Sequence, residues 1–157
     1  MLEVIMAESD VDAFLALRAY ERMHTEGTVP GRLDPVKTFA HLLRWVKGPG
    51  SVVLLAMDGD NIVGALTLVE STSWFANDAD TFLSDRGFYV MPEYRDGEAA
   101  KLLLDAAKTI GDDTKLPVFI TINNGKRKRG GRSEWERVGA TLGYLNRGAT
   151  MAHYPEN

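Results

Sequence analysis

Hydrophobic and polar positions along the chain change period several times, and each period predicts one element. A short apolar run at residues 2–6 predicts a first strand. Apolar side chains then recur at helical spacing, which predicts a helix over residues 10–24 with Ser9 or Asp10 as its cap. The same spacing over residues 35–47 predicts a second amphipathic helix, which ends at a glycine-proline turn.

The rest of the chain alternates strand-like and helix-like patterns. Apolar, β-branched runs predict strands at residues 51–57, 62–73, 82–91 and 116–123, and a last strand or bent pair of strands at 144–154. Helical spacing predicts helices at residues 99–111 and 133–142, the second opened by a capping box at 133–136. The order β-α-α-β-β-β-α-β-α-β is that of an α/β protein with a mixed sheet. Because repeats and linkers are absent from the sequence, we expect a single domain over residues 1–157.

Composition excludes several classes of protein. With 45% hydrophobic and 25% charged residues, the chain has an ordinary globular composition. It has no cysteine, which excludes disulfides, thiolate metal sites and a cysteine nucleophile and fits a cytoplasmic location. The acidic N-terminus is unlike a signal peptide, and no apolar run approaches the ~18 residues that cross a membrane. The net charge of −4 argues against general nucleic-acid affinity.

The stretch from Thr81 to Gly111 organises the chain as strand, turn and helix. Pro92 ends the strand because it has no N–H to donate to a ladder. The helix that follows directs its first N–H groups out of the end of the sheet, where they suit an anion such as a phosphate. In the turn, Gly97 would let the backbone approach this anion, with small alanines beside it. Gly111 is expected to close the helix.

Within this stretch a motif resembles the acyl-CoA signature of the GNAT superfamily of N-acetyltransferases. The family pattern is V-x-P-x-x-R-x-x-G-x-G/A followed by a Leu-Leu pair. Val90, Pro92, Arg95 and Ala100 match it by position, whereas Glu98 stands where the family usually has glycine. Residues 142–144, Leu-Gly-Tyr, also resemble the family's L-G-F at the end of the last helix.

The resemblance implies a GNAT-like acyl-CoA N-acyltransferase fold in which the fourth and fifth strands splay apart. It implies acetyl-CoA as co-substrate, a primary amine of a small molecule or protein as acceptor, and no metal. A homodimer is left open. The pantetheine arm would pair with the backbone of Tyr89, Val90 and Met91, and the pyrophosphate would be held by the amides of Arg95, Asp96, Gly97, Glu98, Ala99 and Ala100.

Acetyl transfer to an amine needs a base, for which a carboxylate can serve. Asp85 interrupts an apolar strand together with Arg86, so it lies either in a functional position or in a strand-end ion pair. Glu70 and Glu26 are the other candidates, the second because its loop commonly lines the acceptor site in the family.

The proton donor for the departing thiolate is harder to assign. The family often has a tyrosine four residues before the glycine of L-G-F, but here that position is Gly139, and another register places Trp135 there. Either Tyr144 or Tyr154 substitutes, or water supplies the proton, or the enzyme is slow or inactive.

A basic loop is the remaining candidate for binding. It comprises Lys126, Arg127, Lys128, Arg129 and Arg132. This loop could contact the 3′-phosphate of CoA or an acidic partner, or it could simply be solvated. The alternative function is therefore a catalytically impaired GNAT-like module that binds a protein or nucleic acid through this loop. The three histidines show no metal-ligand spacing.

Overall fold

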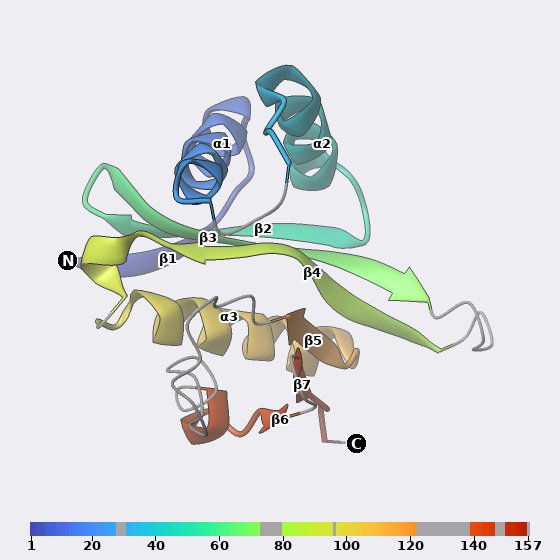
Figure 1. Cartoon of the computed structure of the whole chain (residues 1–157). Helices are drawn as coiled ribbons and strands as arrows, with labels where there is room; N and C mark the ends of the chain where they lie inside the picture. Colours follow the sequence, from blue (N-terminus) through green and yellow to red (C-terminus); the bar gives the residue numbers. More distant parts are fainter. Residues whose placement is uncertain (28–30, 73–79, 96, 122–138, 147–149, 157) are drawn as a thin grey trace.

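In a computed structural model the chain folds into a single seven-stranded sheet with helices on both faces (Figure 1). The structure describes residues 1–27, 31–72, 80–95, 97–121, 139–146 and 150–156. The elements are β1 Leu2–Met6, α1 Asp10–Thr25, α2 Pro35–Lys47, β2 Ser51–Asp58, β3 Asn61–Thr72, β4 Thr81–Val90, the 3₁₀ helix η1 Pro92–Tyr94, α3 Ala99–Thr114, β5 Val118–Thr121, β6 Leu145–Asn146 and β7 Thr150–His153.

The sheet is mixed, as the sequence predicted. Its strand order is β1-β2-β3-β4-β5-β7-β6. Strands β1 to β4 form an antiparallel meander. Helix α3 then returns the chain so that β5 pairs with β4 in parallel, which is the expected use of a helix in a parallel connection. The end of the chain forms the antiparallel pair β6 and β7, so of the two arrangements expected there, a last strand or a pair of strands, the structure has the pair.

Alternation along the central strands separates two hydrophobic cores. Leu54 and Ala56 of β2 face α3, whereas Val53 and Leu55 face α1 and α2. Figure 1 shows α1 and α2 on one side of the sheet and α3 on the other. A central strand covered on both faces carries a continuous apolar run, which is the pattern that identified β2 in the sequence.

The first two helices begin as the sequence predicted. Ser9 caps α1 in a capping box with Asp12, and the side chain of Asp34 accepts from the N–H of Lys37 at the start of α2. The last predicted helix, over residues 133–142, lies mostly outside the described residues, although Gly139 to Thr141 are helical.

The expectation that Gly111 closes its helix is wrong. Helix α3 continues to Thr114 and ends at Lys115, which adopts the left-handed conformation with φ of 59°. Gly111 is needed for another reason, because a Cβ atom at this position would lie 2.6 Å from Cγ2 of Val118. The glycine therefore allows α3 to approach β5 closely.

Candidate functional site

Strands β4 and β5 separate soon after they meet. Among the described residues, which end at Thr121 on this side, their parallel pairing covers only Leu83 with Val118 and Ser84 with Phe119. The next residue of β4, Asp85, then uses its side chain in place of a ladder bond, since Oδ1 accepts from the N–H of Thr121 at 2.8 Å. This arrangement opens the sheet at Asp85, as the GNAT resemblance implied for these strands.

A β-bulge lies at the same place. Thr67 of β3 faces Gly87, whereas the next residue of β3 faces Asp85, so that Arg86 is the extra residue on β4. Tyr20 of α1 fixes this bulge: its hydroxyl donates to the carbonyl of Gly87 at 3.1 Å and lies 2.8 Å from Oγ1 of Thr67. A Cβ atom at Gly87 would lie 2.7 Å from the Tyr20 ring, so only glycine fits beneath it. The sequence pattern alone did not predict this contact.

The carboxyl group of Asp85 is suited to take a proton. Burial raises the pKa of Asp85, and the hydrogen bonds from Thr121 offset this only in part. A raised pKa makes a carboxylate a stronger base, provided that it stays ionised at the working pH. Asp85 thus combines a position at the strand divergence with a favourable electrostatic environment.

Beyond the bulge, the backbone of β4 presents groups to both of its edges. The N–H of Met91 donates to the carbonyl of Val63 at 2.8 Å, so Met91 belongs to the ladder with β3. Hydrogen-bonding direction alternates along an antiparallel strand, which places Tyr89 on the same side and Val90 on the opposite side. Of residues 89–91, which were expected to pair with pantetheine, only Val90 therefore directs its backbone groups to the open edge.

The turn after β4 leads directly to an uncapped helix. The amide of Arg95 donates to Pro92 O at 3.3 Å and that of Gly97 to Tyr94 O at 3.3 Å, so both amides are used within the turn. Asp96 lies outside the described residues. The N-cap of α3, Glu98, makes no side-chain capping bond, and the first helical bond runs from Leu102 N–H to Glu98 O.

The N–H groups of residues 99–101 precede that first bond, and among the described residues they meet no acceptor. In α1 and α2 a side chain caps the corresponding end. The anion site expected over residues 95–100 thus narrows to the start of α3, where free N–H groups and the helix dipole coincide.

The small side chains of the motif serve the core. Ala99 and Ala100 are 0% and 1% exposed and pack in the cluster beneath α3, so the expectation that they leave room beside a ligand is wrong. Glu98 is exposed. Gly97 has no left-handed φ, and a Cβ atom there would meet only Tyr94 O at an ordinary 3.5 Å. The described part of the chain therefore does not itself require glycine at position 97.

Arg95 binds to protein groups. Its Nε donates to the carbonyl of Val90 at 2.9 Å, and its Nη2 lies 2.6 Å from Oε2 of Glu26, at the end of α1. The hydroxyl of Tyr89 donates to the other carboxylate oxygen of Glu26. The guanidinium also lies 5.5 Å from the centroid of the Tyr89 ring. We call Glu26, Tyr89 and Arg95 the Glu26 cluster.

The remaining catalytic candidates lie elsewhere. Burial alone would raise the pKa of Glu26, but hydrogen bonds from Tyr89 and Arg95 outweigh it and hold that pKa below its usual value, which makes Glu26 a weak base. Glu70 is exposed, and its carboxylate lies beside Gly50 at the start of β2, on the side of β3 away from β4.

Two tyrosines were candidates for the proton donor. Tyr144 is buried beneath α3 and donates its hydroxyl to the carbonyl of Leu104 at 2.7 Å, and burial raises its pKa. Tyr154 is 45% exposed and packs edge-on against Phe119. A catalytic role for either stays a prediction, as does the role of the basic loop, because residues 126–132 lie outside the described residues.

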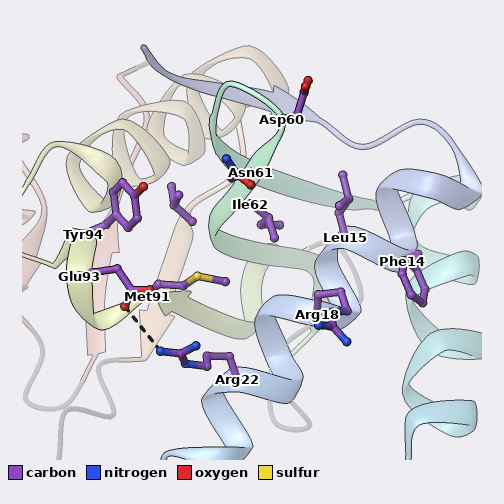
Figure 2. A pocket seen from close by; sticks show the side chains of 11 residues that line it. Phe14, Leu15, Arg18, Arg22, Asp60, Asn61, Ile62, Met91, Glu93 and Tyr94 are labelled. Atoms are coloured by element: carbon purple, nitrogen blue, oxygen red, sulfur yellow. Dashed lines mark ion pairs between the residues drawn. The ribbon is translucent and has the colours of Figure 1, made fainter.

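A cavity of about 560 Å³ lies on the α1 face of the sheet, between α1, the β2–β3 turn and η1 (Figure 2). Leu15, Ile62 and Met91 contribute apolar surface. Arg22 of α1 reaches Glu93 of η1 across it at 3.8 Å. Sequence reasoning did not predict this cavity, because its walls come from three segments far apart in the chain.

Among the described residues no group of three or more histidine, aspartate or glutamate residues is placed to hold a metal ion. No helix within the described ranges has the length and apolar character needed to cross a membrane.

Comparison with known proteins identifies the fold. No protein-family model and no curated protein matches the sequence. Among solved structures, an acetyltransferase of the GNAT family from Streptococcus pneumoniae matches with a TM-score of 0.70 and 13% identity over 99% of this chain and 100% of that one. A predicted acetyltransferase with acetyl-CoA from Clostridium acetobutylicum matches with a TM-score of 0.68 and 13% identity over 93% and 91%.

AAC(6')-Iy, in complex with the bisubstrate analogue CoA-S-monomethyl-acetylneamine, matches with a TM-score of 0.64 and 14% identity over 100% of this chain and 99% of that one. Near-complete coverage of both chains shows that the likeness is that of the whole fold. The chain therefore has the fold of the GNAT acetyltransferases, as its sequence order and turn motif indicated.

Proposed function

We propose that the chain is an acetyl-CoA-dependent N-acetyltransferase that forms one domain over residues 1–157. One observation carries the proposal: within the described residues the N-terminus of α3 has no side-chain cap, and it follows, after η1 and a short turn, the strand from which β5 separates. A strand edge and a free helix terminus are thus adjacent, in a fold that other proteins use to bind acetyl-CoA or a CoA analogue. An extended thiol arm suits the first feature, and a pyrophosphate suits the second.

In this proposal the backbone of Val90 pairs with the pantetheine arm at the open edge of β4. The amides at the start of α3 hold the pyrophosphate. The thioester then lies toward the bulge, because the arm runs along β4 from α3 toward Gly87. Asp85 is adjacent to that bulge, whereas Glu70 lies on the other side of β3.

Asp85 is the proposed general base. It accepts a proton from the acceptor ammonium, directly or through a water molecule, which leaves the nitrogen lone pair free to attack the thioester carbon. A carbon–nitrogen bond forms and the carbon–sulfur bond breaks, with its electron pair leaving on sulfur. The nitrogen loses its second proton as the amide forms, and water passes that proton to the thiolate, since Tyr144 already donates its hydroxyl proton to Leu104.

Two measurements test the proposal. Isothermal titration should show saturable binding of acetyl-CoA, and the parent chain should release free thiol from acetyl-CoA when a primary amine is added. Absence of binding at millimolar acetyl-CoA would contradict the proposal. Binding without turnover across aminoglycoside, polyamine and peptide amines would favour the binding module acting through residues 126–132.

A further inference from the structure

The Glu26 cluster joins three segments that are remote in sequence. Glu26 follows the last turn of α1, Tyr89 belongs to β4, and Arg95 belongs to the turn that leads into α3. Both carboxylate oxygens of Glu26 are used, one by the Tyr89 hydroxyl and the other by Arg95. The side chains of Glu26 and Arg95 are only 19% and 33% exposed, so their contact is partly removed from solvent.

Arg95 invites a different interpretation from its position alone. An arginine beside a pyrophosphate site is an ideal bidentate ligand for phosphate. Here, however, Nε is directed to the Val90 carbonyl and Nη2 to Glu26, and the guanidinium lies against the Tyr89 ring. A bidentate contact with phosphate through Nε and Nη2 would first require these contacts to break.

We propose that Glu26 is a positioning residue for the cofactor turn, and that Arg95 acts as its clamp instead of as a phosphate ligand. The inference rests on the proposed acetyl-CoA site. Glu26 holds the guanidinium so that Arg95 keeps the end of β4 and the following turn in one arrangement. That arrangement fixes the direction in which the N–H groups of α3 point.

Lysine cannot replace Arg95 in this role. The clamp needs two donors at a fixed separation, one for the Val90 carbonyl and one for Glu26. A lysine ammonium has its donors on a single nitrogen and cannot span both acceptors in the same way. Arg95→Lys therefore keeps the charge near the pyrophosphate and loses the clamp.

The two roles of Arg95 predict opposite effects of Glu26→Gln on affinity. If Glu26 positions the turn, the variant should bind acetyl-CoA about tenfold more weakly, which is about 1.4 kcal/mol. If Arg95 is a phosphate ligand, the same variant releases the guanidinium and should bind more tightly. Titration at 25 °C and one fixed salt concentration distinguishes them, with thermal unfolding as a check that each variant is folded at that temperature.

Three further variants complete the test. Arg95→Lys, and the double variant that combines it with Glu26→Gln, should each lose as much affinity for acetyl-CoA as Glu26→Gln does, because both lose the same clamp. Tyr89→Phe keeps the ring and removes one donor to Glu26, so it should weaken binding by about threefold, a smaller loss of the same kind. It also keeps the inference testable if Glu26→Gln does not fold.

The matched control is Glu93→Gln, since Glu93 joins the same turn to the same helix through Arg22 and leaves in place the Arg22 charge that acts on Glu26. That pair is 3.8 Å apart and about half exposed on both sides. An exposed pair of this kind contributes little, so affinity should change less than twofold.

Steady-state kinetics separate positioning from stability alone. Positioning raises KM for acetyl-CoA and leaves kcat within about twofold, whereas a purely structural role lowers the melting temperature and leaves the affinity at 25 °C unchanged. If the parent chain binds acetyl-CoA and Glu26→Gln binds it equally or more tightly, only the positioning role is overturned. A parent chain that does not bind acetyl-CoA overturns both this inference and the proposed function.

Discussion

Replacing Asp85 with asparagine should abolish most activity and at the same time stabilise the fold. A general base contributes about 10²- to 10⁴-fold to rate, which corresponds to about 2.7 to 5.5 kcal/mol of activation free energy. Asparagine cannot accept the proton, so kcat should fall by that factor. The acid limb of the pH–rate profile, which reports ionisation of the base, should disappear with it.

The stabilisation follows from the direction of the pKa shift. Burial raises the pKa of Asp85 in the folded chain above its value in the unfolded chain. The resulting contribution to stability is fully present below the unfolded pKa of about 3.9 and is lost as pH rises through the folded pKa. At neutral pH the ionised side chain is therefore destabilising. A neutral asparagine avoids that cost and still offers Oδ1 to the N–H of Thr121.

Urea unfolding of the parent and Asp85→Asn at pH 8 and near pH 4 gives the comparison. The Asp85→Asn variant should have the higher free energy of unfolding at pH 8, and its advantage should shrink toward pH 4. Asp85→Ala is the control, because it removes the acceptor for the Thr121 N–H and should therefore lose about 1 kcal/mol of unfolding free energy. If Asp85→Asn keeps kcat within about fivefold of the parent, or is the less stable chain at pH 8, the assignment of Asp85 as a partly buried base is wrong.

Three other substitutions test the site. Gly97→Ala should leave the melting temperature nearly unchanged, since its Cβ meets only Tyr94 O at 3.5 Å. Titration should nevertheless show that the variant binds acetyl-CoA at least tenfold more weakly. Equal affinity would place the ligand elsewhere. Glu98→Gln should tighten acetyl-CoA by roughly three- to tenfold at low salt and little at high salt, because the removed repulsion is screened. Tyr144→Phe should lower the free energy of unfolding by about 1–3 kcal/mol, because the Leu104 carbonyl loses this donor. The kcat of the folded enzyme should be unchanged at 25 °C. A hundredfold loss of kcat would instead make Tyr144 the proton donor.

The order of elements could be predicted from the sequence because each one has its own hydrophobic period and its own capping or turn residues at its ends. The strand before Pro92 and the helix after Glu98 follow from local rules. That their junction binds an anion stays a prediction. Local rules do not report what a small residue faces. Gly111 was predicted as a helix end because glycine is common there, whereas its role depends on Val118 of the next strand.

The parts of the site that depend on long-range contacts could not be predicted. Glu26 lies 63 residues from Tyr89 and 69 from Arg95, and nothing in the local pattern of any of the three indicates the others. The hydroxyl of Tyr20 likewise reaches Gly87 across 67 residues. Its helical spacing correctly predicted a core position, and only the folded sheet shows that it fixes the bulge beside Asp85.

The narrow contact between β4 and β5 bears on how the molecule opens locally. Within the described ranges only Leu83 and Ser84 of β4 pair with β5, so few of the backbone bonds seen there join the meander β1–β4 to the β5–β7–β6 group. Helix α3 also holds that group, through Tyr144 to Leu104 and through His153 to Asp112 at 2.7 Å. Because α3 packs in one buried cluster with residues of β2, β3, β4 and β5, it links the group to the meander. In native-state hydrogen exchange we expect the backbone where β4 and β5 separate to open more readily than the rest of the sheet. A ligand lying between β4 and β5 would raise the protection of that backbone.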